Sequence, residues 1–157
     1  MSRKNRIFGV TVLAFLLYGC SQPLAYNWRD GEKICAQVGS QNYLLEIARS
    51  GNAHSQGLQG RQELERGRGM LFVFDRASSQ KFWMKKTLIP LDIIWYSADY
   101  AAIAQQSMPV EANPESPQNI YEPPKPAQYA VEINQNETEV PVGSTLAFIA
   151  RDQCEAK

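Results

Sequence analysis

The feature that most constrains the fold is a series of short apolar segments that recur along the 157-residue chain. Most are rich in β-branched or aromatic residues and are bounded by Gly, Pro, Asn, Asp or Ser, which is typical of strands rather than helices. The segments read KICAQV, YLLEIAR, MLFVF, KFWMKKT, LDIIWYS, AAIAQQS, QYAVEIN and STLAFIAR. The pattern predicts a mainly β fold with one short helix, forming a compact antiparallel β-barrel or a sandwich-like single domain.

Two stretches depart from this pattern. Residues 55–67 (SQGLQGRQELERG) offer Ser55 as an N-cap and place Leu58 and Leu64 on one face, so they predict the short helix. Residues 107–127 contain six prolines, a density that excludes regular structure. We therefore expect a long, partly extended loop to cross the domain there.

The start of the chain has the composition of a secretory signal. In residues 1–19 a basic beginning precedes an apolar run that is shorter than the ~20 residues of a membrane span. The ending Leu17-Tyr18-Gly19-Cys20 resembles a bacterial lipobox, which implies that Cys20 is acylated and becomes the mature N-terminus. Tyr18 replaces the small residue that is usual there, so ordinary secretion with Cys20 as a plain thiol stays open.

On this interpretation the protein lies in the cell envelope. A serine directly after the lipidated cysteine is typical of sorting to the outer membrane of a Gram-negative cell, so we expect the periplasmic face of that membrane. Residues 20–31 would form the lipid-anchored tether and residues 32–157 the single folded domain. The lipid anchor makes the membrane the first predicted partner.

The charge of the mature chain argues against a nucleic acid partner. Cleavage after residue 19 removes three basic residues and no acidic one, which leaves 13 basic against 16 acidic residues, a net charge of −3. Binding to nucleic acid requires a clustered basic surface. No basic block remains, so nucleic acid is not an expected partner.

The two cysteines that follow Cys20 form a candidate disulfide. In an oxidising envelope, Cys35 and Cys154 are an even pair, and they would close a loop of more than a hundred residues. Such a bridge would stabilise the fold by roughly 4 kcal/mol through the unfolded chain. Two unpaired thiols are the alternative. The spacing excludes a CxxC redox motif and a zinc site.

Several kinds of catalytic site are missing from the sequence. The chain has one histidine, His54, and no nucleophile elbow, P-loop or dinucleotide fingerprint. We therefore expect no metal and no cofactor. A single histidine before a helix is most often a capping or surface residue, which is the interpretation preferred for His54.

The stretch KFWMKKTLIPLDIIW (81–95) reads as two strands joined by a bend at Pro90, which cannot donate to a ladder. Asp92 begins the second strand, whose two faces are both largely apolar, so its carboxylate is expected to be partly buried and to need a cation or several donors. In the first strand, alternation places three candidate ligand-binding residues on one face: Trp83, Lys85 and Thr87.

Arg61 is the candidate cation for that carboxylate. Helical spacing places Arg61 inside an apolar stripe, where its planar guanidinium needs a carboxylate partner. The first choice is Asp92 and the second is Glu46. The pair either holds the helix on the sheet or, with Trp83, Lys85 and Thr87, lines a cleft suited to an anionic or sugar-like ligand.

Three segments, GLQGR (57–61), GRGMLFVF (67–74) and FWMKKTLIPLDIIW (82–95), resemble the DUF192 family, also called UPF0127. The family pattern reads GLMxR, GMLFVF and FWMKNTxIPLDIIF in the same order. QYAVEIN (128–134) also fits, and the resemblance spans roughly residues 35–150. It implies a compact β-rich single domain that often follows a signal peptide or lipid anchor, and it implies no particular activity.

This chain departs from the family pattern at three positions. Gln59 stands where the family usually has Met, Lys86 where it has Asn, and Ser144 where it has Asp. If the Asn position contacts a ligand, Lys86 adds a charge to that contact. Transfer of a family site to these positions is therefore not assumed.

Three functions are consistent with the sequence. The first is a non-catalytic envelope lipoprotein that binds a small molecule, a glycan or a partner protein. The second is a carbohydrate-acting enzyme that uses Asp92 or Glu46 as its acid or base, which usually requires a second carboxylate. The third is a purely structural or assembly component. An open cleft lined by Arg61, Trp83 and Asp92 would favour a ligand, whereas a closed ion pair would favour the structural role.

Overall fold

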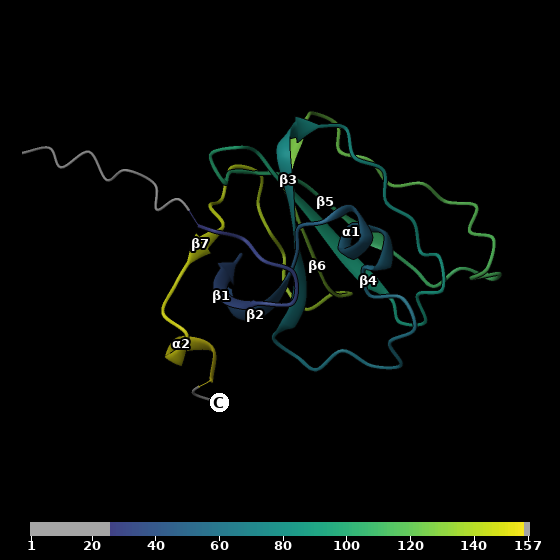
Figure 1. Ribbon diagram of the computed structural model, residues 1–157, viewed down its shortest axis with the longest axis horizontal. Helices are drawn as coiled ribbons and strands as arrows, with labels where there is room; N and C mark the ends of the chain where they lie inside the picture. The colour runs from purple at the N-terminus through teal and green to yellow at the C-terminus, as the bar shows by residue number, and fades with distance from the viewer. Residues whose placement is uncertain (1–25, 156–157) are drawn as a thin grey trace, which may run out of the picture.

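The computed structural model describes residues 26–155, which form a single seven-stranded sheet (Figure 1). The sheet order is β5-β4-β6-β3-β2-β1-β7, and every neighbouring pair is antiparallel except β2 and β3. The strands are β1 (Lys33–Val38), β2 (Gln41–Ala48), β3 (Arg68–Ser78), β4 (Leu91–Tyr96), β5 (Ala102–Met108), β6 (Ala127–Asn134) and β7 (Ala147–Phe148). The predicted mainly β single domain is confirmed. The signal, the lipobox and half of the tether, residues 20–25, lie outside the described residues.

The sheet curls so that its two edges meet. The N–H of Ala102, at the start of β5, donates to the carbonyl of Ser144 at 2.8 Å, and the N–H of Leu146 donates to the carbonyl of Tyr100 at 2.9 Å. Ala101 and Thr145 form an isolated bridge between the same segments. These bonds join β5 to the residues that lead into β7, so one curled half-barrel forms rather than a sandwich of two sheets.

The parallel pair of β2 and β3 requires a crossover, and residues 49–67 supply it. Its helix, α1 (Gly51–Gln56), begins after Ser50, whose hydroxyl accepts a hydrogen bond from the Ala53 N–H at 3.2 Å. The helix stops at Gly57, which has a φ of 48°. The predicted helix over 55–67 is therefore wrong, because the glycines within it end a helix that starts earlier.

The C-terminus returns to the first strand. A second short helix, α2 (Asp152–Glu155), was not predicted, and it carries Cys154 to within 5.9 Å, Cα to Cα, of Cys35 in β1. The predicted Cys35–Cys154 disulfide is confirmed. It fastens the chain end to the β1 edge of the sheet, and β7 pairs with the same strand.

Apolar side chains cover both faces of the sheet. The inside of the curl holds one cluster, which includes Tyr43, Leu45, Leu71, Ile94 and Tyr96. The outer face holds a second cluster, which includes Leu58, Phe72, Met84, Ile93 and Trp95. In Figure 1, α1 and the long loops after β3 and β5 lie over that outer face. All six residues of β4 are buried because both of its faces are covered.

The stretch 81–95 is half as predicted. Its second strand is confirmed as β4, but residues 81–90 form a loop whose one ladder contact is the bridge between Phe82 and Tyr121. Lys86 has a φ of 52°, which no strand accommodates. Within the described part of the chain, no helix is long and apolar enough to cross a membrane.

Candidate functional site

Arg61 and Asp92 do not pair with each other. The Arg61 guanidinium donates to Glu46 at 2.7 Å, and both side chains are about one third exposed. The predicted first choice is therefore wrong, and the second choice is found. Arg61 lies in the turn after α1 rather than in a helix, so the helical spacing that directed it at Asp92 does not apply.

Asp92 obtains its partners from the neighbouring strand and a turn. Its carboxylate accepts from the Ser107 hydroxyl at 2.6 Å, the Asn136 N–H at 2.9 Å and the Gln105 side-chain amide at 3.1 Å. Ser107 is the residue opposite Asp92 in the β4–β5 ladder. Three neutral donors satisfy the carboxylate, so the buried charge needs no cation.

The five predicted ligand-binding residues do not line one cleft. Arg61 lies with Glu46 in one shallow hollow, Asp92 lies in a second beside β5, and Trp83 and Thr87 line a third. Lys85 is exposed and lines none of the three. The proposed cleft over this set does not exist, because residues 81–87 are a loop on the outer face rather than a strand beside Asp92.

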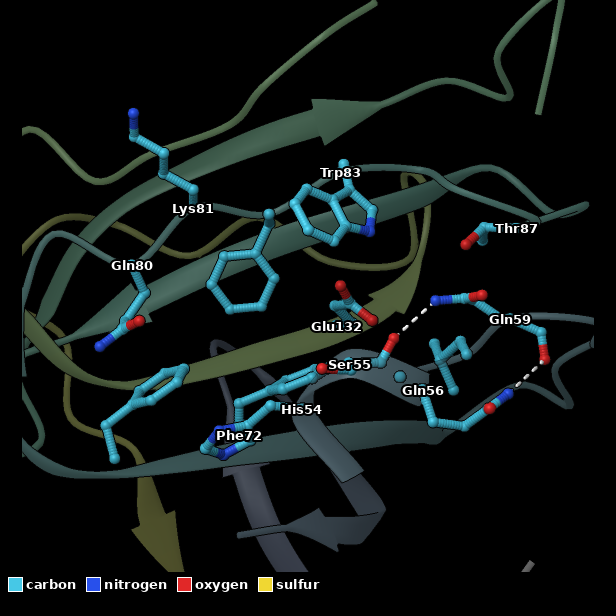
Figure 2. Close-up of a pocket in the computed structure, with 14 residues that line it drawn as sticks. His54, Ser55, Gln56, Gln59, Phe72, Gln80, Lys81, Trp83, Thr87 and Glu132 are labelled. Carbon is cyan, nitrogen blue, oxygen red and sulfur yellow. Dashed lines mark hydrogen bonds between the residues drawn. The ribbon is translucent and has the colours of Figure 1, made fainter. Parts of the chain in front are cut away.

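The third hollow, called the α1 pocket here, is the smallest and the most enclosed of the three (Figure 2). It has a volume of about 160 Å³ and lies between α1, strand β3 and the loop that carries Trp83. Its lining residues are His54, Ser55, Gln56, Gly57, Leu58, Gln59, Phe72, Phe74, Gln80, Lys81, Phe82, Trp83, Thr87 and Glu132. Aromatic rings form its walls, and hydroxyl and amide groups surround its mouth.

Glu132 at the floor of the α1 pocket is the most unusual residue of the site. It lies in the middle of β6, between Met70 of β3 and Ile93 of β4, and is only 6% exposed. No other described residue forms a hydrogen bond or an ion pair with its carboxyl group. Burial raises its pKa from the ordinary 4.5 to about 8, so the group is largely uncharged at neutral pH.

The walls of the pocket are a packed aromatic set. The rings of Phe72 and Phe82 meet edge to face with centroids 5.1 Å apart, and Phe74 lies 6.3 Å from Phe82. Trp83 is 47% exposed at the mouth. In Figure 2 the Glu132 carboxyl group points into the space between Trp83 and Ser55. A ligand in this space would contact aromatic carbon on its sides and a carboxyl group beneath it.

His54 has a structural role at the edge of the pocket. Its Nε2 lies 3.1 Å from the carbonyl of Ala48 and 3.2 Å from that of Val73, so the imidazole joins α1 to the ends of β2 and β3. The ring also stacks near Phe74, at 4.5 Å between centroids. His54 is therefore neither the helix cap nor the surface residue before a helix that the sequence favoured, because it lies within α1 and bridges two strands.

Sequence reasoning missed Glu132. One signal was present, because QYAVEIN holds a single acid inside an otherwise apolar strand. Gly69 of β3 lies close to the backbone of Glu132: a Cβ at Gly69 would lie 2.5 Å from the backbone oxygen of Glu132. Only glycine lets the two strands approach this closely beside the pocket floor.

Of the three departures from the family pattern, one reaches the pocket. Gln59 lines it, and its side-chain amide donates to the carbonyl of Ser55 at 2.6 Å. Lys86 lines no part of it, and its Nζ lies 3.5 Å from the Glu115 carboxylate. Because Asn tolerates a positive φ better than Lys, the family's Asn suits the backbone of that turn. The Ser144 hydroxyl bonds the carbonyl of Pro141 at 2.6 Å and supports another turn.

Metal chemistry has no evident centre here. Among residues 26–155, no three His, Cys, Asp or Glu side chains gather closely enough to hold a metal ion.

Solved structures share this fold. A protein from Sinorhizobium meliloti 1021, provisionally described as a transcription regulator, aligns with a TM-score of 0.68 and 24% identity over 76% of this chain and 96% of its own. A protein of unknown function from Novosphingobium aromaticivorans DSM 12444 aligns with a TM-score of 0.55 and 25% identity over 66% of this chain and 73% of its own. At this identity the first likeness shows the fold alone.

The comparison with curated protein sequences found no match. The family comparison did find one, with DUF192, described as "Uncharacterized ACR, COG1430", over residues 34–148. That range contains every strand of the sheet except the first residue of β1, together with the whole α1 pocket. The protein therefore belongs to the DUF192 family.

Proposed function

We propose that this protein is an envelope lipoprotein, anchored through Cys20 at the periplasmic face of the outer membrane, whose domain binds a small molecule in the α1 pocket without transforming it. The observation that carries the proposal is Glu132, a buried carboxyl group with no partner in the described chain, directed into an aromatic-walled pocket. Buried polar groups are normally satisfied, and one that is not needs an explanation. A bound ligand supplies that explanation.

The sequence motifs support the same pocket. The segment 57–61 contributes Gly57, Leu58 and Gln59, the segment 67–74 contributes Phe72 and Phe74, and the segment 82–95 contributes Phe82, Trp83 and Thr87. The segment 128–134 contributes Glu132. Four motif segments that are distant in sequence therefore line one hollow. This is the arrangement expected if the segments together form one binding site.

Binding is favoured over catalysis on a carbohydrate. Such enzymes use two carboxyl groups across the scissile bond, whereas Glu132 is the one acid that lines the α1 pocket. Glu46 is paired with Arg61, and Asp92 accepts three hydrogen bonds on the opposite face of the sheet. Since a carboxyl group forms the floor, the ligand is expected to be neutral or cationic rather than anionic.

The test is a ligand screen with a filled pocket as its control. The full-length protein, purified in a non-ionic detergent, is screened by saturation-transfer NMR against small sugars, polyols and amines. Ser55 is exposed at the mouth, so Ser55→Phe fills the pocket at little cost in stability. Asn52→Phe adds the same ring on the same helix at an exposed position outside the pocket.

At least one compound is expected to bind wild type and Asn52→Phe but not Ser55→Phe. Absence of any binder, or binders that Ser55→Phe leaves unchanged, would contradict the proposed site.

The anchor is tested separately. Cells that express the protein with labelled palmitate are expected to label wild type but not Cys20→Ser, and the labelled protein should sediment with outer membranes. An unlabelled wild-type protein would support plain secretion instead.

A further inference from the structure

We propose that the α1 pocket selects small organic cations, with the ammonium group of the ligand paired to the carboxylate of Glu132. The inference rests on the proposed function, because it names the class of ligand that the pocket takes. Three observations carry it: the unpaired carboxyl group, the aromatic walls and the size of the pocket.

The unpaired carboxyl group is the first observation. A mostly buried carboxyl group that faces a pocket without a protein donor loses much of its hydration, and a cation brought by a ligand compensates its ionised form directly. The protein supplies no such cation from the elements around Glu132. Its ladder neighbours Met70 and Ile93 are uncharged, and the His54 ring on α1 is already engaged by two backbone carbonyls. Lys81, on the loop, is an exposed rim residue.

The aromatic walls are the second observation. The faces of aromatic rings attract cations, and the attraction strengthens where water is excluded. Phe72, Phe74 and Phe82 line the inner wall and Trp83 the mouth. A carboxyl group beneath several rings suits an alkylated ammonium group better than a sugar ring, which would need more hydrogen-bonding groups at the floor.

The size of the pocket is the third observation. Its volume of about 160 Å³ is roughly half of the ~300 Å³ at which drug-sized pockets begin. The occupant is therefore a compact molecule, such as a short alkyl ammonium ion or a single amino sugar.

Binding of a permanent cation has a consequence for protons. The pKa of Glu132 stands at about 8 in the empty pocket because burial disfavours the charged form. A paired cation favours that form, so Glu132 loses its proton to the buffer as the ligand binds. The affinity for a cation should then rise with pH up to about 8 and level off above it, because only the ionised carboxyl group forms the pair.

The experiment is isothermal titration of matched pairs with the full-length protein in a non-ionic detergent near pH 6.5. Choline is compared with 3,3-dimethylbutan-1-ol, which has the same shape without the charge, and glucosamine is compared with glucose. Each titration is repeated in two buffers of different ionisation enthalpy to count protons. We expect the cation of each pair to bind at least about tenfold more tightly, with nearly one proton released per choline.

Glu132→Gln is the decisive variant, because it keeps the shape of the side chain and removes its charge. It should lose the cation preference, the proton release and the pH dependence, while its thermal unfolding near pH 5 confirms that it is folded. Lys85→Gln is exposed and outside the pocket and should change none of these.

Three outcomes would overturn the inference. Equal binding within each pair would show a small-molecule site without charge selectivity, so the proposed function would stand and the cation inference would fail. A cation preference that persists in Glu132→Gln would place the selectivity elsewhere. Failure of both cations to bind would also end the inference, and the separate ligand screen would then decide the proposed function.

Discussion

Two buried carboxyl groups lie on neighbouring strands of this sheet, and they differ in the number of hydrogen bonds that they accept. In the β4–β6 ladder Asp92 pairs with Ile133 and Glu132 pairs with Ile93, so the two acids occupy neighbouring rungs on opposite faces. They are 2% and 6% exposed. Asp92 accepts three hydrogen bonds from neutral donors, whereas Glu132 receives none from the described residues.

The comparison teaches that burial alone does not identify a functional acid. Asp92 is as buried as Glu132, yet its partners make it part of the fold, because it fastens β4 to β5 and to the turn at Asn136. Glu132 contributes no such bond, and removing most of its carboxyl group from water is unfavourable for folding. An acid that does not help the fold is the better candidate for a ligand.

The largest expected effect is on Glu132. Because its folded pKa of about 8 lies above the ordinary 4.5, the folded state loses stability as pH rises between these values and loses none below pH 4.5. Glu132→Gln should therefore be more stable than wild type by about 4 kcal/mol near pH 8.5 and no more stable near pH 4, since each pKa unit corresponds to about 1.4 kcal/mol. Urea unfolding at both pH values measures this, and a pH-independent difference would break the comparison.

The opposite sign is expected at Asp92. Asp92→Ala leaves three donors without their acceptor and should lower the free energy of unfolding by about 3 kcal/mol at neutral pH. Ser107→Ala removes one of the three bonds and should cost about 1 kcal/mol as its graded control. Urea unfolding measures both. If Asp92→Ala is neutral or stabilising, Asp92 is not the structural member of the pair.

Gly69 tests whether the floor beneath Glu132 is tightly built. A methyl group there would lie 2.5 Å from the Glu132 backbone oxygen, so Gly69→Ala should destabilise the fold by about 2 kcal/mol. Gly51→Ala is the control, because no atom lies within 4 Å of its Cβ position. Equal thermal midpoints for the two variants would contradict a tight contact at Glu132.

The smallest effect is expected at a third acid, Glu46. Its pair with Arg61 is about one third exposed on both sides, so Glu46→Gln should cost only about 0.5 kcal/mol, and less in high salt. It should leave ligand binding unchanged. A loss of binding would move the candidate site to that hollow and away from Glu132.

Much of the fold could be predicted from the sequence. Branched and aromatic segments marked the strands because such residues suit a pleated, half-buried surface, and β4 was placed correctly on that basis. The Cys35–Cys154 bridge followed from the pairing of two cysteines. The helix was misplaced because Gly57 and Gly60 were treated as weak helix residues, whereas their positive φ angles end the helix.

The site was less predictable, for a physical reason. Alternation correctly places Ala130 and Glu132 on one face of β6, but it does not say that α1 and a loop cover that face. Trp83, a predicted ligand-binding candidate, is exposed and lines the α1 pocket, although a loop rather than a strand presents it. The role of Glu132 depends on donors that are missing nearby, and only the three-dimensional arrangement reveals that.

The fastening of both chain ends to one edge of the sheet governs how the pocket can be reached. The Tyr26 ring contacts Phe148 of β7 at 5.0 Å, and the disulfide holds α2 against β1. Tyr26 therefore begins the described chain beside β7, and in Figure 1 α1 lies across the sheet from β7. If Cys20 carries the proposed anchor, we expect the edge of the sheet at β7 to face the bilayer and the α1 pocket to open towards the aqueous compartment. A soluble molecule can then diffuse in without crossing or leaving the membrane surface.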